Sequence, residues 1–132
     1  HREFEYGLQE VCIREDVGLL AFSPLAMGVL SGKYGSGRLP AASRLAKFPR
    51  YQSRWGRPEQ LASAAAFAKA ARRSGFDPAE LALAWVRDRA GVASVLSSCT
   101  SSHQVDALIA SAEIAPDGDT LRAIEAAMNI AQ

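Results

Sequence analysis

The sequence lacks the marks of several protein classes. It has no apolar run near the ~18 residues that a transmembrane helix needs, which excludes a membrane span. Basic and acidic residues nearly balance, at 15 against 14, so a broad nucleic-acid-binding surface is not expected, although a small basic patch stays open. Repeats of solenoid length, charge blocks and low-complexity tracts are also absent.

The first residues and the cysteines indicate the cellular compartment of the protein. The opening residues have no signal-peptide layout and no initiating Met, so we expect a cytoplasmic chain that begins inside a longer protein or after processing. Cys12 and Cys99 are the only cysteines, and they lack the spacing of metal ligands. We expect both to be buried small hydrophobic residues in a reducing compartment, with no metal site.

What is present indicates one domain of mixed class. A length of 132 residues allows a single domain, and 48% hydrophobic with 22% charged residues is typical of a folded one. Apolar periodicity and turn residues predict two short strands among several helices. The strands are predicted over residues 18–22 and 92–96, and the helices over 3–15, 58–75, 77–89 and 102–111, with a last helix opening at Pro116.

Alternation of strands and helices predicts an α/β fold with a parallel sheet. The continuous apolar run at residues 18–22 is typical of a strand buried on both faces. Two strands alone leave free edges and uncovered faces, so they cannot complete such a sheet. We therefore expect residues 1–132 to be a single incomplete domain, completed by missing chain or by self-association.

The first segment that can carry chemistry runs from residue 19 to residue 44. A predicted buried strand ends at Phe22, and a long loop with Gly28, Lys33 and Arg44 follows it. Ligands bind at the carboxyl ends of strands in α/β folds, and glycine lets the backbone approach them closely. The two cations can pair with phosphates. From the residues alone, a solvated basic loop is an equally good interpretation.

The second segment, residues 94–108, leads from the second predicted strand into a helix. Its hydroxyl and amide side chains stand where unpaired backbone N–H groups and the helix dipole favour an anion. Plain helix capping by Ser101 or Ser102 is the alternative.

Aromatic and basic residues alternate between Arg50 and Arg57, and Tyr51 and Trp55 lie among them. Such interleaving can indicate stacking of nucleic-acid bases. The balanced overall charge favours a simpler interpretation, in which this loop packs across the mouth of the fold.

Taken together, the motifs resemble the aldo-keto reductases. The run FSPLAMGVLSGKY is followed by SR, then by LALAWV and VLSSCTSSHQV, in the order and at the distances of that family. The likeness covers essentially the whole chain. It is nearest to the branch with a GKY cofactor loop, which includes bacterial reductases and potassium-channel β subunits.

The resemblance implies a (β/α)8 TIM barrel that binds NADP(H). This chain would be its C-terminal portion, with strands seven and eight, their flanking helices and a long cofactor loop. The implied function is the cofactor-binding part of a reductase that transfers hydride to an aldehyde or ketone. A non-catalytic nucleotide-binding or regulatory module of the same fold is the alternative. No nucleic-acid or membrane partner is expected.

The resemblance also implies roles for single residues. Phe22 would take the aromatic position that stacks on the nicotinamide. Lys33 and Arg44 would hold phosphates under a loop that folds over the cofactor. The pyrophosphate path would be lined by Ser23, Leu25 and Gly28. The 2′-phosphate and adenine end would be lined by Thr100 and Gln104.

Several positions depart from the family pattern. Ala107 and Leu108 stand where the family commonly has an acidic residue and an Asn for the adenine, and Ser98 stands where this branch often has Gly. The Asp, Tyr, Lys and His set that supplies the family's acid catalysis cannot be mapped here. Tyr34 belongs to the phosphate loop, and His103 is expected to face solvent. The chain alone is therefore predicted to be inactive, with no catalytic residue of its own.

Overall fold

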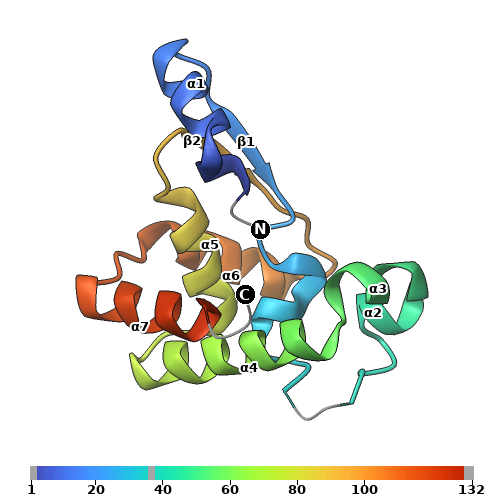
Figure 1. Ribbon diagram of the computed structural model, residues 1–132. Coiled ribbons are helices and arrows are strands. Elements are labelled where there is room, and N and C mark those ends of the chain that lie inside the picture. The colour runs from blue at the N-terminus through green and yellow to red at the C-terminus, as the bar shows by residue number, and fades with distance from the viewer. Residues whose placement is uncertain (1–2, 36–37, 130–132) are drawn as a thin grey trace.

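A parallel pair of strands and a layer of helices make up the protein (Figure 1). The computed structural model describes residues 3–35 and 38–129. In chain order the elements are η1 (Glu3–Tyr6), α1 (Leu8–Arg14), β1 (Leu19–Phe22), η2 (Ala26–Ser31), α2 (Arg44–Lys47), η3 (Pro49–Tyr51), α3 (Gln52–Trp55), α4 (Pro58–Arg73), α5 (Pro78–Arg87), β2 (Val92–Leu96), α6 (Ser102–Glu113) and α7 (Gly118–Asn129).

The parallel pairing predicted for the two strands is confirmed. β1 runs parallel to β2, from Leu19 opposite Val92 to Phe22 opposite Leu96. A Cβ at Gly18 would clash with the Cβ of Ala93, so glycine permits the close approach at the start of the pair.

The expectation that the first strand is buried on both faces is wrong within the described chain. Side chains of β1 alternate between half-buried and exposed, and Leu20 and Phe22 are 56% and 72% exposed. The physical reason is that no element of the described chain covers the face on which these two side chains lie.

Local start signals explain where the long helices begin. Pro58 and Pro78 occupy the first turns of α4 and α5, where a missing N–H costs nothing. The Asp77 carboxylate accepts hydrogen bonds from the N–H groups of Ala79 and Glu80, at 2.8 and 3.2 Å, as expected for an N-cap.

The last and the first helix differ from the prediction most clearly. The last helix begins at Gly118 rather than at Pro116, because Asp117 is its cap and accepts a 2.7 Å hydrogen bond from the N–H of Thr120. That bond lowers the pKa of Asp117 below its ordinary value. The first helix is split at Gly7, whose φ of 151° suits glycine, into η1 and α1.

The main core lies between α4, α5 and α7, and α4 and α7 run side by side (Figure 1). Phe67, Leu81 and Ile124 are at most 1% exposed there. A second cluster ties the segment after β1 to α4; its buried members are Val29, Tyr34, Leu45 and Ala64. The long loop expected after the first strand therefore contains short helices, η2, α2, η3 and α3, that are anchored on this cluster.

Cys12 and Cys99 are free and half-buried, so the expectation of full burial is wrong. Within the described residues, no helix is both long and apolar enough to cross a bilayer.

Candidate functional site

Both segments singled out in the sequence leave the sheet at the same edge. β1 and β2 are parallel and end in register, with Phe22 opposite Leu96. Residues 23–44 and 97–104 therefore start from the adjacent carboxyl ends of two strands. That is the edge at which ligands bind in α/β folds.

The turn after β1 has an unusual backbone. Ser23, Ala26 and Met27 have positive φ values of 54°, 48° and 59°, and Gly28 follows at 85°. Left-handed backbone costs of order 1–2 kcal/mol at a non-glycine residue, so surrounding contacts must hold it. Hydrogen bonds from the Ala26 N–H to the Ser23 carbonyl (2.9 Å) and from the Gly28 N–H to the Leu25 carbonyl (2.8 Å) close the turn.

Met27 is the point on which the neighbouring side chains of this segment converge. Its carbonyl accepts a long hydrogen bond of 3.5 Å from the buried Tyr34 hydroxyl. Its sulfur lies 3.9 Å from Nη1 of Arg44. A Cβ at Gly28 would clash with Nζ of Lys33, which lies 5.3 Å from the centroid of the Tyr34 ring. The structure thus brings Gly28, Lys33 and Arg44 together.

Arg44 is exposed between two anchored neighbours. Ser43 is 5% exposed and caps α2 by accepting a 3.3 Å hydrogen bond from the N–H of Ala46. Leu45 is fully buried in the second cluster. The backbone that carries the Arg44 guanidinium is therefore fixed. Neither this guanidinium nor the Lys33 ammonium is within ion-pair distance of a described carboxylate, so both cations are available to an anion.

The segment after β2 combines capping with a fixed amide. Ser101 caps α6 and accepts from the Gln104 N–H at 3.4 Å, so the capping alternative is realised. Oε1 of Gln104 accepts from the N–H and the hydroxyl of Thr100, at 2.8 and 3.2 Å. These two bonds orient the Gln104 carboxamide and leave its NH₂ end to donate elsewhere. His103 is exposed, as predicted.

Other predicted site residues are placed less distinctively. Phe22 stands at the end of β1 with 72% of its surface exposed. Leu25 packs against the main core, which gives it a structural role at the turn. Leu108 is half-buried, and its carbonyl accepts a 2.6 Å hydrogen bond from the hydroxyl of Ser111.

Sequence reasoning missed Met27 and the anchoring role of Tyr34. Tyr34 is only 4% exposed, although it stands in a basic, glycine-rich stretch that favours a solvated loop. No local signal distinguishes Met27, because its contacts depend on three consecutive residues with positive φ.

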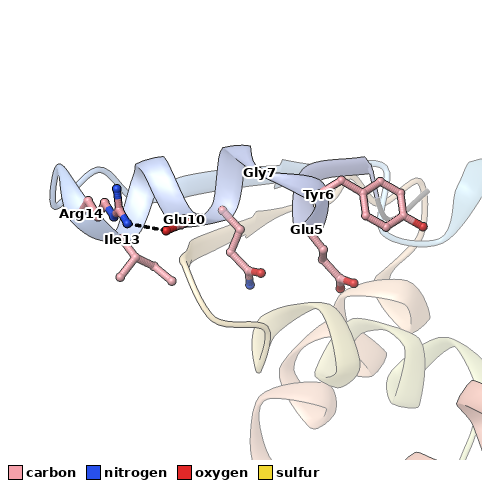
Figure 2. Close-up of a pocket in the computed structure, with 7 residues that line it drawn as sticks. Glu5, Tyr6, Gly7, Glu10, Ile13 and Arg14 are labelled. Carbon is pink, nitrogen blue, oxygen red and sulfur yellow. Dashed lines mark ion pairs between the residues drawn. The ribbon is translucent and has the colours of Figure 1, made fainter.

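A hollow of about 550 Å³ lies away from all of these residues. It is lined by Glu5, Tyr6, Gly7, Gln9, Glu10, Ile13 and Arg14. Figure 2 shows Glu10 and Arg14 facing each other along α1, with an ion pair of 2.6 Å. Every wall comes from one continuous, mostly exposed segment rather than from several strand ends, so we assign it no function.

The comparisons with known proteins decide the family. A model of the aldo/keto reductase family matches residues 1–129. The chain belongs to the aldo/keto reductase family. The resemblance found in its motifs is thereby confirmed. Among the described residues, no group of three His, Cys, Asp or Glu side chains could hold a metal ion.

Its relatives in this family include a bacterial protein and a potassium channel subunit. Protein tas of Escherichia coli is 44% identical over 126 residues, which is 96% of this chain and 36% of that protein. A probable voltage-gated potassium channel subunit beta of rice, Oryza sativa, is 35% identical over 91 residues, 67% of this chain and 28% of that protein. The chain thus spans about a third of the length of these relatives.

A solved family structure agrees on the fold. The glycerol dehydrogenase of Gluconobacter oxydans superposes with a TM-score of 0.75 at 21% identity, over 99% of this chain and 40% of that one. The α/β architecture with two parallel strands is therefore that of a part of an aldo/keto reductase.

Proposed function

We propose that residues 1–132 form the cofactor-binding C-terminal portion of a cytoplasmic, NADP(H)-dependent aldo/keto reductase. In this proposal β1 and β2 are strands seven and eight of the (β/α)8 barrel, and residues 23–57 are its cofactor loop. The residues form a single incomplete domain. The substrate of the whole protein is an aldehyde or a ketone.

The convergence of Gly28, Lys33 and Arg44 at the carboxyl end of β1 carries the proposal. A dinucleotide phosphate needs cationic donors and a backbone that lets it come close. The two cations lack described carboxylate partners, and any Cβ at Gly28 would displace the Lys33 ammonium. The donor set therefore fits phosphates.

The remaining predicted residues fit the cofactor to different degrees. The exposed ring of Phe22 is suited to stacking on a nicotinamide, and Ser23 and Leu25 belong to the same turn as Gly28. Thr100 and Gln104 offer a hydroxyl and an oriented amide for the 2′-phosphate and adenine end. The Leu108 side chain cannot hydrogen-bond an adenine, so we propose that the adenine end of the cofactor is bound more weakly.

The chemistry divides between this chain and the rest of the protein. When bound, the cofactor supplies a hydride from its nicotinamide ring to the carbonyl carbon of the substrate. The residues of this chain bind and orient the cofactor, and the proton for the carbonyl oxygen comes from an acid outside the 132 residues. We therefore expect no NADPH-dependent reduction of a reactive aldehyde by the purified 132-residue chain.

Fluorescence titration of NADPH into a family-length protein that contains this sequence tests the proposal. Lys33→Ala and Arg44→Ala should each weaken binding by about 1–3 kcal/mol, because each removes a charge-assisted hydrogen bond to phosphate. Leu108→Asn should tighten it. Lys69→Ala, which removes an exposed cation on α4, is the matched control and should leave binding unchanged. Unchanged NADPH affinity in both the Lys33 and the Arg44 variant would contradict the proposal that this segment binds the cofactor.

A non-catalytic nucleotide-binding or regulatory module is the second candidate. It is favoured by the 35% identity to a protein named as a probable potassium channel subunit. Assays of the family-length protein separate the two functions. Tight NADPH binding without reduction of any aldehyde or ketone would support the module, whereas turnover that depends on added aldehyde would support the reductase.

The exposed apolar side chains of β1 and α1 are proposed to be covered by the remaining part of the barrel, or by a second copy when this chain is alone. Leu20, Phe22 and Val11 are each more than half exposed. If the purified 132-residue chain sediments as a compact monomer and also melts cooperatively, this part of the proposal is contradicted.

A further inference from the structure

Charge is distributed unevenly along this chain. Residues 17–58 contain seven basic residues and no Asp or Glu, so this segment carries a formal charge of +7. The other 90 residues hold eight basic and fourteen acidic residues, a formal charge of −6. Soluble surfaces ordinarily intersperse the two signs. The proposed cofactor phosphates account for Lys33 and Arg44 only, and leave five basic residues without a role.

Two of these five are held in place by aromatic rings. The Arg50 guanidinium carbon lies 5.0 Å from the Tyr51 ring centroid and 6.0 Å from that of Phe48. Arg50 also donates a 3.3 Å hydrogen bond to the Tyr51 hydroxyl. The guanidinium carbon of Arg54 lies 5.2 Å from the Trp55 ring. The two arginines and the three aromatic residues around them are here called the arginine-aromatic face: Phe48, Arg50, Tyr51, Arg54 and Trp55.

The inner side of this face is anchored. Tyr51 and Trp55 pack against the second core cluster, and the Gln52 amide donates a 3.0 Å hydrogen bond to the Leu45 carbonyl. η3 and α3 lie beyond the first turn of α4, away from the strands (Figure 1). The two guanidiniums therefore project from a fixed base, so a partner that binds them orders little additional chain.

We propose that the arginine-aromatic face binds an acidic segment of a partner protein. Arg50 and Arg54 are exposed, stand four residues apart, and have no carboxylate among the described ion pairs. Arg50 lies in η3 and Arg54 in α3, which follows it directly, so both guanidiniums come from one short continuous segment. Carboxylates spaced alike on a partner pair with both at once.

The stacking geometry favours carboxylates over nucleic-acid bases. A guanidinium that lies on an aromatic ring keeps its N–H donors at its edge, and a carboxylate binds that edge with two parallel hydrogen bonds. A base needs an open ring face on which to stack. Here guanidiniums lie over the rings of Tyr51 and Trp55, so a stacking base would have to displace them.

A fluorescein-labelled oligoglutamate peptide is the probe, titrated by anisotropy against the family-length protein at low and at physiological salt. The double substitution Arg50→Glu with Arg54→Glu should weaken peptide binding by at least about tenfold, because two charge-assisted pairs become repulsions. The matched control is Lys69→Glu with Arg73→Glu, two exposed basic residues four apart on α4. It changes the net charge equally and should alter binding less than about twofold.

A conservative double substitution provides a second test in case the Glu double variant does not fold. Arg50→Lys with Arg54→Lys keeps the charge but removes the bidentate and stacked geometry, so binding should fall by an intermediate factor. If circular dichroism shows that the Glu double variant is unfolded, the Lys variant decides, and an affinity equal to the wild type overturns the proposal. Three further results overturn it: no peptide binding by the wild type, equal losses in the Glu double variant and its control, or tighter binding of a labelled single-stranded oligonucleotide than of the peptide.

Discussion

The layer of α4, α5 and α7 and the pair of strands with α1 bury their apolar residues to very different extents. In the helical layer, Phe67 and Ile124 are 1% and 0% exposed. In the strand region, Leu20, Phe22 and Leu8 are 56%, 72% and 58% exposed. The helices cover one another, whereas the strands have an apolar face that no described element covers. An apolar pattern therefore predicts that a face will be buried, but not which part of a protein buries it.

Two phenylalanines give the largest expected contrast between these regions. Phe67→Ala should destabilise the chain by about 3–5 kcal/mol, because it removes a large side chain from a closely packed core. In the 132-residue chain at a dilution where no second copy covers it, Phe22→Ala should change stability by less than about 0.5 kcal/mol, because most of its surface is then in water. Urea denaturation of both variants measures the difference, and similar losses would show that the strand region is packed after all.

Two arginines sharpen the comparison within the helices. The Arg87 guanidinium donates hydrogen bonds to the carbonyls of Ser111 (2.7 Å), Ala112 (2.9 Å) and Ile114 (2.7 Å), at the end of α6. Its hydrogen bond to Asp88 raises the pKa of Arg87. Arg87→Ala should cost about 2 kcal/mol in urea denaturation, since three carbonyls lose a charged donor.

Arg122→Ala is the control for that substitution. Arg122 pairs with Asp119 on the surface of α7, and both side chains are more than two-thirds exposed. Its loss should be at most about 0.5 kcal/mol. Equal effects for the two arginines would mean that the carbonyl contacts of Arg87 add no stability.

A smaller effect is expected where α5 meets α7. Oε1 of Glu125 accepts from the Trp85 indole N–H and from Arg89, both at 3.1 Å, while Arg89 stacks 4.2 Å from the Trp85 ring. Glu125→Ala should lower the thermal stability by about 1 kcal/mol, and Glu125→Gln by less, since an amide oxygen still accepts. Equal losses in the two variants would assign the effect to charge alone.

The smallest effect is a dependence on pH at the start of α7. The pKa of Asp117 is lowered in the folded chain because its carboxylate accepts from Thr120. Its contribution is therefore present above the unfolded pKa and is lost as the pH falls towards the folded one. Asp117→Asn keeps the cap but does not titrate, so its melting temperature should fall less steeply with acid. Parallel acid profiles for the two proteins would contradict this assignment.

The sequence predicted local elements well and long-range contacts less well. β2 was predicted over the residues it occupies, and the Asp77 cap and Pro78 identify the start of α5, because these signals are local. The start of α7 lies two residues after the predicted one, because Asp117 caps the helix and the nearby Pro116 does not begin it. The exposure of β1 could not be read from its apolar run, since exposure depends on what packs against it.

In the candidate site, too, the residues of a local motif were predictable, whereas the contacts between distant residues were not. Gly28, Lys33 and Arg44 stand in a recognisable motif, and the structure brings them together. The role of Met27 between Tyr34 and Arg44 was not predictable. It arises from a left-handed backbone at two non-glycine residues, which no propensity favours.

The parallel pairing of β1 with β2 also has a consequence for the order of folding. The two strands are separated by residues 23–91, so a long stretch of chain must be organised before they can meet. Closing such a loop costs entropy before any strand contact is gained, whereas α4 and α5 are neighbours in sequence and form their contacts locally. We therefore expect the pair of α4 and α5 to form before β1 and β2 meet, and the edge of the sheet that carries the candidate site to be completed later.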